Sequence, residues 1–128
     1  AALMYAGDKA TADELLADAT EEFKDRLAQS DFVLSAANTV GNYRLMADLY
    51  ERRLGLDGSV AQNWASLAFV YYQESNASGT DPITKRQLVD KAISTLTRGA
   101  EAVPSFAPTA TCVAENLRNG RAPETNCQ

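Results

Sequence analysis

The segment that decides the fold is residues 61–73, which read AQNWASLAFVYYQ and place Trp64, Leu67, Ala68 and Tyr71 three or four positions apart. This spacing puts the four side chains on one face of an α-helix, because an α-helix turns once in about 3.6 residues. A second helix can approach closely at the small Ala68, while the larger side chains fill the space beside it. The segment therefore predicts a helix packed tightly against a neighbouring helix.

The helical period extends through the rest of the chain, and no stretch shows the sustained alternation that is typical of a strand. Turn and cap residues divide the chain into pieces of helix length. Asp81 is expected to cap the helix that Pro82 begins, since a proline at the first helical position loses no hydrogen bond. Ser105 is expected to cap the last helix, which ends at Gly120. The expected helices cover residues 1–6, 9–29, 32–40, 43–56, 60–73, 82–102 and 105–120. The sequence therefore predicts an all-α fold.

The composition is that of an ordinary globular protein: 128 residues, of which 45% are hydrophobic and 23% charged. A chain of this length fits one domain with a modest core. The net charge of −5 argues against nucleic acid or an anionic membrane surface as partner. No apolar run approaches the roughly 20 residues that span a bilayer. Residues 1–5 read like the interior of a helix, so we expect a piece of a longer protein.

The spacing of Trp64, Leu67, Ala68 and Tyr71 resembles the first helix of a tetratricopeptide repeat, with Ala68 where glycine is commoner. Ala92, Leu96 and Pro104 follow in the order of the second helix of that repeat. The resemblance implies a solenoid of helical hairpins with about 2.5 repeats. Its parts are a partial repeat over 1–29, a repeat over 30–58, a repeat with an insertion over 59–104, a capping helix over 105–120 and a tail over 121–128.

The interval from Trp64 to Pro104 is about twelve residues longer than an ordinary repeat requires. The extra residues fall within 74–87 and comprise a polar loop over 74–80 and an early start to the next helix. Such an insertion either lies beside a binding face or is a surface feature without a role.

A narrower resemblance is to the repeats that follow the membrane-spanning part of bacterial O-antigen ligase or polymerase-like proteins. It is carried by Gly41-Asn42-Tyr43, by residues 61–64 with Leu67-Ala68 and Tyr71-Tyr72, and by the closing runs 104–106 and 115–120. The resemblance implies a domain that faces the periplasm beside a membrane glycan enzyme.

The two cysteines, Cys112 and Cys127, leave two alternatives open. A disulfide between them would indicate an oxidising compartment, periplasmic or extracytoplasmic. Free thiols would instead suit the cytoplasm. Because the chain contains no CxxC motif and no histidine, the usual zinc patterns are excluded.

The positions that line the concave groove of a tetratricopeptide stack carry amide, hydroxyl, carboxylate and aromatic side chains here. Such a surface can receive an extended peptide through backbone hydrogen bonds and apolar pockets. Alternatively, a neighbouring helix covers this face. The predicted groove residues are Asp31, Ser35, Asn38, Thr39, Gln62, Ala65, Phe69 and Tyr72.

Catalytic chemistry has no candidate in the sequence. No nucleophile–base pair, phosphate-binding glycine loop or metal cluster is present, so we expect no catalytic residue, cofactor or metal. The acidic residues between 13 and 25 suit a solvated helix face, and Arg52 and Arg53 suit a helix C-terminus. We therefore expect a non-catalytic scaffold domain, part of a larger bacterial protein, that binds a protein or peptide. The alternatives are an accessory domain of a glycan enzyme, or self-association through residues 3–5.

Overall fold

The computed structural model describes residues 25, 26 and 28–127, and every structural statement concerns these residues. The chain divides into two compact units, Ala1–Leu56 and Asp57–Gln128, each described by itself. The expected helices over 1–6 and most of 9–29 lie outside the described residues. The same holds for the acidic residues before Asp25 and for residues 3–5, the expected self-association site.

The described residues contain five complete α-helices and no strand, which confirms the predicted all-α class. The helices of the first unit are α4 (Asp31–Thr39) and α5 (Tyr43–Leu56). The second unit contains α6 (Ala61–Ser75), α7 (Pro82–Ala102), a 3-10 turn (Pro104–Phe106) and α8 (Ala107–Arg118). The bounds of α4 to α7 agree with the expected helices to within two residues. None of these helices combines the length and the apolar composition that a membrane crossing needs.

Two side-chain caps form, and the one at Asp81 was predicted. The Ser30 hydroxyl accepts a hydrogen bond from the Val33 N–H at 3.2 Å and so begins α4. The Asp81 carboxylate accepts one from the Thr84 N–H at 2.9 Å, directly before Pro82. Each cap satisfies a backbone donor that the first helical turn leaves unpaired.

The expected cap at Ser105 is wrong. Pro104, Ser105 and Phe106 form the 3-10 turn, closed by a hydrogen bond of 2.8 Å from the Phe106 N–H to the Val103 carbonyl. α8 then begins at Ala107 without a side-chain cap. The turn buries the ring of Phe106 and leaves Ser105 exposed, so burial of the aromatic ring decides the local backbone.

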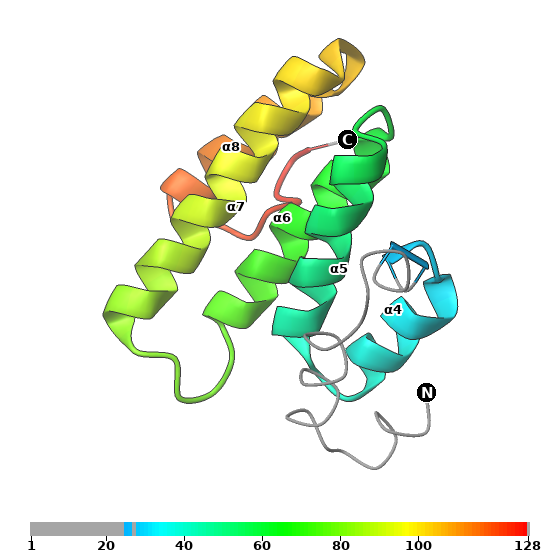
Figure 1. Cartoon of the computed structure of the whole chain (residues 1–128). Helices are drawn as coiled ribbons and strands as arrows, with labels where there is room; N and C mark the ends of the chain where they lie inside the picture. Colours follow the sequence, from blue (N-terminus) through cyan, green and yellow to red (C-terminus); the bar gives the residue numbers. More distant parts are fainter. Residues whose placement is uncertain (1–24, 27, 128) are drawn as a thin grey trace. The chain divides into compact units, whose positions relative to one another are not determined.

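The three helices of the second unit run antiparallel in succession, and α7 packs against both α6 and α8 (Figure 1). Trp64 is 6% exposed, and its indole N–H donates to the Gly58 carbonyl at 2.9 Å. Gly99 of α7 faces this ring so closely that an added Cβ would lie 2.8 Å from the Trp64 Cβ. A small residue therefore packs against a bulky one between α6 and α7, at Gly99 and Trp64, a contact that the sequence did not single out.

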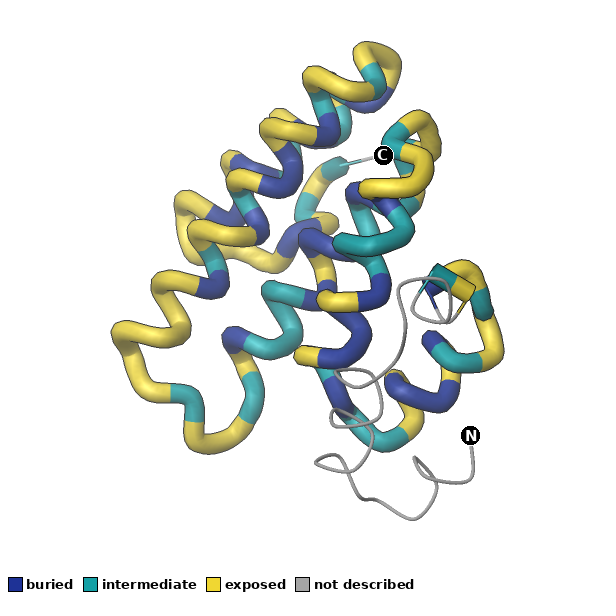
Figure 2. Tube along the Cα trace, viewed as in Figure 1, coloured by how far each residue is buried: buried dark blue, intermediate teal, exposed yellow. Residues whose placement is uncertain are grey.

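The extra residues of the second unit are mostly helical. α6 continues through Glu74 and Ser75, which the sequence placed in a loop, because Ser75 is buried. The connecting loop is then residues 76–81. The first six residues of α7, 82–87, are all exposed (Figure 2). Of residues 74–87, the first two thus belong to α6 and the last six to α7.

In the first unit, Gly41 adopts φ +69°, a left-handed conformation that glycine favours, and so makes the predicted turn between α4 and α5. Two arginines of α5 contact the chain that precedes α4, at Asp25 and Ala28. Arg53 donates to the Ala28 carbonyl at 2.7 Å, and Arg52 pairs with Asp25 at 3.1 Å. Both arginines therefore bind groups of the first unit itself, which favours a structural role for them.

Candidate functional site

A pocket of about 460 Å³ opens in the second unit between α6, α8 and residues 121–127, here called the C-terminal segment. We call this pocket the α6–α8 groove. Its walls are mostly apolar. Its lining includes Gln62, Ala65, Ser66 and Phe69 of α6, Thr109, Val113 and Leu117 of α8, and Pro123, Glu124 and Cys127 of the C-terminal segment.

Three of the four groove residues predicted on α6 line this pocket: Gln62, Ala65 and Phe69. Phe69 is 42% exposed, which is unusual for a large apolar residue. Tyr72 is not part of the lining, but its ring lies beside that of Phe69, with centroids 6.4 Å apart. The Gln62 amide donates to the Ser66 hydroxyl at 3.1 Å. The structure therefore brings the α6 half of the predicted groove together.

The other four predicted residues, Asp31, Ser35, Asn38 and Thr39, are exposed on α4 of the first unit. The Asp31 carboxylate pairs with Arg53 at 3.2 Å, and the Thr39 hydroxyl donates to the Ser35 carbonyl at 2.9 Å. Because these residues belong to a different unit, a single groove of eight residues stays a prediction.

The end of α8 turns the chain back on itself. Gly120 adopts φ +71°. The Arg121 N–H donates to the Asn116 carbonyl at 2.8 Å, and the Gly120 N–H donates to the Leu117 carbonyl at 3.2 Å. These two bonds with a left-handed glycine make a Schellman motif, which satisfies carbonyls left unpaired at a helix end. The C-terminal segment can therefore return beside α8.

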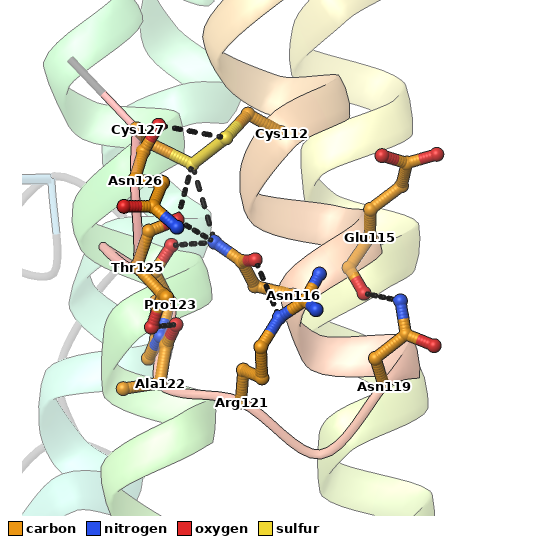
Figure 3. Close-up of a disulfide and its surroundings, with 10 residues drawn as sticks. All are labelled: Cys112, Glu115, Asn116, Asn119, Arg121, Ala122, Pro123, Thr125, Asn126 and Cys127. Carbon is orange, nitrogen blue, oxygen red and sulfur yellow. Dashed lines mark hydrogen bonds between the residues drawn. A yellow bond between two sulfur atoms is a disulfide. The ribbon is translucent and has the colours of Figure 1, made fainter.

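Asn116 fastens the returning segment (Figure 3). Its side chain is buried, and its amide nitrogen donates to the carbonyls of Pro123 at 3.1 Å and Thr125 at 2.7 Å. Its amide oxygen accepts a hydrogen bond from the Arg121 Nε at 3.1 Å. Asn116 is not among the site residues predicted from the sequence. The available signal was its position four residues after Cys112, on the same helix face.

A disulfide joins Cys112 of α8 to Cys127, with the Cα atoms 5.9 Å apart (Figure 3). Of the two alternatives that the sequence left open, a disulfide or free thiols, the structure contains the disulfide. Pro123 is buried as well. Residues 121–127, expected only as a tail, are therefore folded back and form one wall of the groove.

Two carboxyl groups are electrostatically distinctive, and neither lines the groove. Hydrogen bonds from the Ser59 hydroxyl and then the Ser59 N–H lower the pKa of Asp57. At Asp81, bonds from the Thr84 N–H and then the Thr84 hydroxyl lower the pKa. Both carboxylates are exposed and shape turns or caps. Within the described part of the chain, no three potential ligands among His, Cys, Asp and Glu come together to hold a metal ion.

Comparison of the chain with models of known families, with curated proteins and with solved structures finds no match. The tetratricopeptide and O-antigen ligase resemblances therefore stay predictions.

Proposed function

We propose that this chain is a non-catalytic, tetratricopeptide-like scaffold domain that receives a protein or peptide in the α6–α8 groove. The observation that carries the proposal is the convergence of Gln62, Ala65 and Phe69 on one open, mainly apolar pocket. The repeat positions alone predict these three residues as groove residues.

The lining of the groove suits a peptide ligand with an apolar side chain as its anchor and polar backbone groups on either side. Ala65, Phe69 and Val113 offer apolar contacts, while Gln62 and Glu124 offer polar atoms for orientation. Covering the exposed 42% of Phe69 would bury about 80 Å² and contribute about 2 kcal/mol to binding. A contribution of this size makes Phe69 the expected hot spot of the surface.

The disulfide supports a place outside the cytoplasm, because disulfides persist in oxidising compartments. This placement favours a second candidate, an accessory periplasmic domain of an O-antigen ligase or polymerase-like glycan enzyme. Reading the full-length gene tests that candidate. About ten or more upstream membrane-spanning segments would support it, and their absence would remove it.

The groove is tested by selecting peptides from a displayed random library on the full chain. A labelled selected peptide is then titrated by fluorescence anisotropy. We expect Phe69→Ala to weaken binding about 30-fold, the equivalent of about 2 kcal/mol. Ile83→Ala is the matched control, because Ile83 is apolar, 73% exposed and in the same unit but outside the groove.

Equal affinities for Phe69→Ala and the parent chain would show that peptides bind elsewhere. A similar loss in Ile83→Ala would show that the library reports general surface hydrophobicity. Either result contradicts the proposed groove, and so does a library that yields no binder.

A further inference from the structure

The C-terminal segment is a wall of the groove that belongs to no helix. Its own hydrogen bonds are short turns, from the Thr125 N–H to the Ala122 carbonyl and from the Cys127 N–H to the Glu124 carbonyl, each 3.2 Å. Beyond Arg121, which bonds to Asn116 at the helix end, two attachments bind the segment to α8: the Asn116 amide nitrogen and the disulfide at Cys112. The segment therefore depends on contacts one helical turn apart on α8.

We propose that the Cys112–Cys127 disulfide is a redox latch on the α6–α8 groove. In the oxidised chain the segment narrows the groove to the observed pocket. After reduction by a dithiol, the segment departs and α6 and α8 face each other across a longer, open groove. This regulation rests on the proposed function, since it controls access to the same surface.

The reduction balances as ordinary thiol–disulfide exchange. A thiolate of the dithiol attacks the Cys112 sulfur, the S–S bond breaks, and Cys127 leaves as a thiolate that takes a proton from water. The second thiolate of the dithiol then attacks its own sulfur in the mixed disulfide, and Cys112 is released and protonated. The dithiol becomes a disulfide, and the chain gains two electrons and two protons.

The local geometry favours this direction of attack. The Asn116 amide nitrogen lies 3.2 Å from the Cys127 sulfur. That amide shares its two N–H groups among the Pro123 and Thr125 carbonyls and this sulfur, and the shared N–H stabilises the negative charge that forms on Cys127 as the bond breaks. Once the disulfide is broken, the segment is attached to α8 through the chain at Gly120 and through the hydrogen bonds of Asn116.

The helices do not need the segment to stay together. α6 and α7 meet at Trp64 and Gly99, and α7 and α8 form their own direct contact. The disulfide closes a loop with a sequence separation of 15. Opening a loop of that size favours the detached segment by about 100-fold in the open-to-closed ratio.

Hydrogen exchange of the full chain, with and without dithiothreitol, tests the latch. We expect the amides of Thr125 and Cys127 to exchange about 100-fold faster after reduction. The helical circular dichroism and the emission of Trp64 should stay unchanged, and binding of the dye bis-ANS should rise as the groove opens. The Cys112→Ser, Cys127→Ser double variant should match the reduced chain and show no response to dithiothreitol.

Unchanged exchange of the segment after complete reduction would overturn the latch, because Asn116 would then hold the segment alone. Loss of the helical signal would overturn it too, since the disulfide would then maintain the helices. These measurements use no peptide ligand. A failure of peptide selection therefore bears on the proposed function, and unchanged exchange bears on the latch.

Discussion

Gly99→Ala should destabilise the second unit although alanine is the better helix former. A Cβ at this position would lie 2.8 Å from both Cβ and Cγ of Trp64 and 3.1 Å from Cε2 of Phe106. The Trp64 Cβ cannot move without its backbone, so α6 and α7 must separate. Overpacking of this kind costs about 3 kcal/mol, and the helix propensity of alanine returns about 1 kcal/mol. The expected net loss is about 2 kcal/mol.

Trp64 is the only tryptophan in the chain, so its emission reports unfolding of the second unit selectively. A loss of about 2 kcal/mol should lower the midpoint of thermal unfolding by roughly 10 °C in a unit of this size. The matched control is Gly55→Ala in α5, where an added Cβ meets nothing within 4 Å. That variant should gain about 0.5 kcal/mol, followed by circular dichroism.

A Gly99→Ala chain that is as stable as the parent, or more stable, would refute the close approach of α6 and α7. A destabilised Gly55→Ala chain would show that the alanine effect has another origin. Only the opposite signs of the two substitutions support the packing argument.

Two further substitutions test the contacts that shape the helix ends. Asn116→Ala should lower the free energy of unfolding by about 3 kcal/mol, because the carbonyls of Pro123 and Thr125 lose their buried donor. Urea denaturation followed by the emission of Trp64 measures this loss, and an unchanged midpoint would contradict the role of the amide. Asp81→Asn should flatten the acid dependence of stability. The folded pKa of Asp81 lies below its ordinary value of 3.8, so its stabilisation is present above that pH and lost as the pH falls through the folded pKa. Thermal unfolding between pH 2 and 6 should therefore show a shallower acid decline in Asp81→Asn than in the parent, and parallel curves would refute the cap.

The sequence predicted those features that depend on neighbours along the chain. Helical periodicity located α5 and α7, and the pair Asp81-Pro82 located the start of α7, because caps and proline act within one turn. The burial of Trp64 followed from the same periodicity. These signals are local, so no tertiary information was needed.

The remaining features depend on contacts between segments that are distant in sequence. From the sequence alone Gly99 is only a weak helix former, and its role as a packing contact depends on Trp64, which lies opposite it. Asn116 reads as a surface residue until the chain reverses at Gly120 and brings two carbonyls to its amide. The α6 half of the candidate groove was predictable from repeat positions, whereas the wall formed by the C-terminal segment was not.

The bridge between Cys112 and Cys127 also decides how mechanical force enters the second unit. Tension applied to the chain after Cys127 passes through the two sulfur atoms into the middle of α8. The intervening residues, including the last turn of the helix and the reversal at Gly120, carry none of that load. About 50 Å of contour length is therefore withheld from stretching while the bridge is intact.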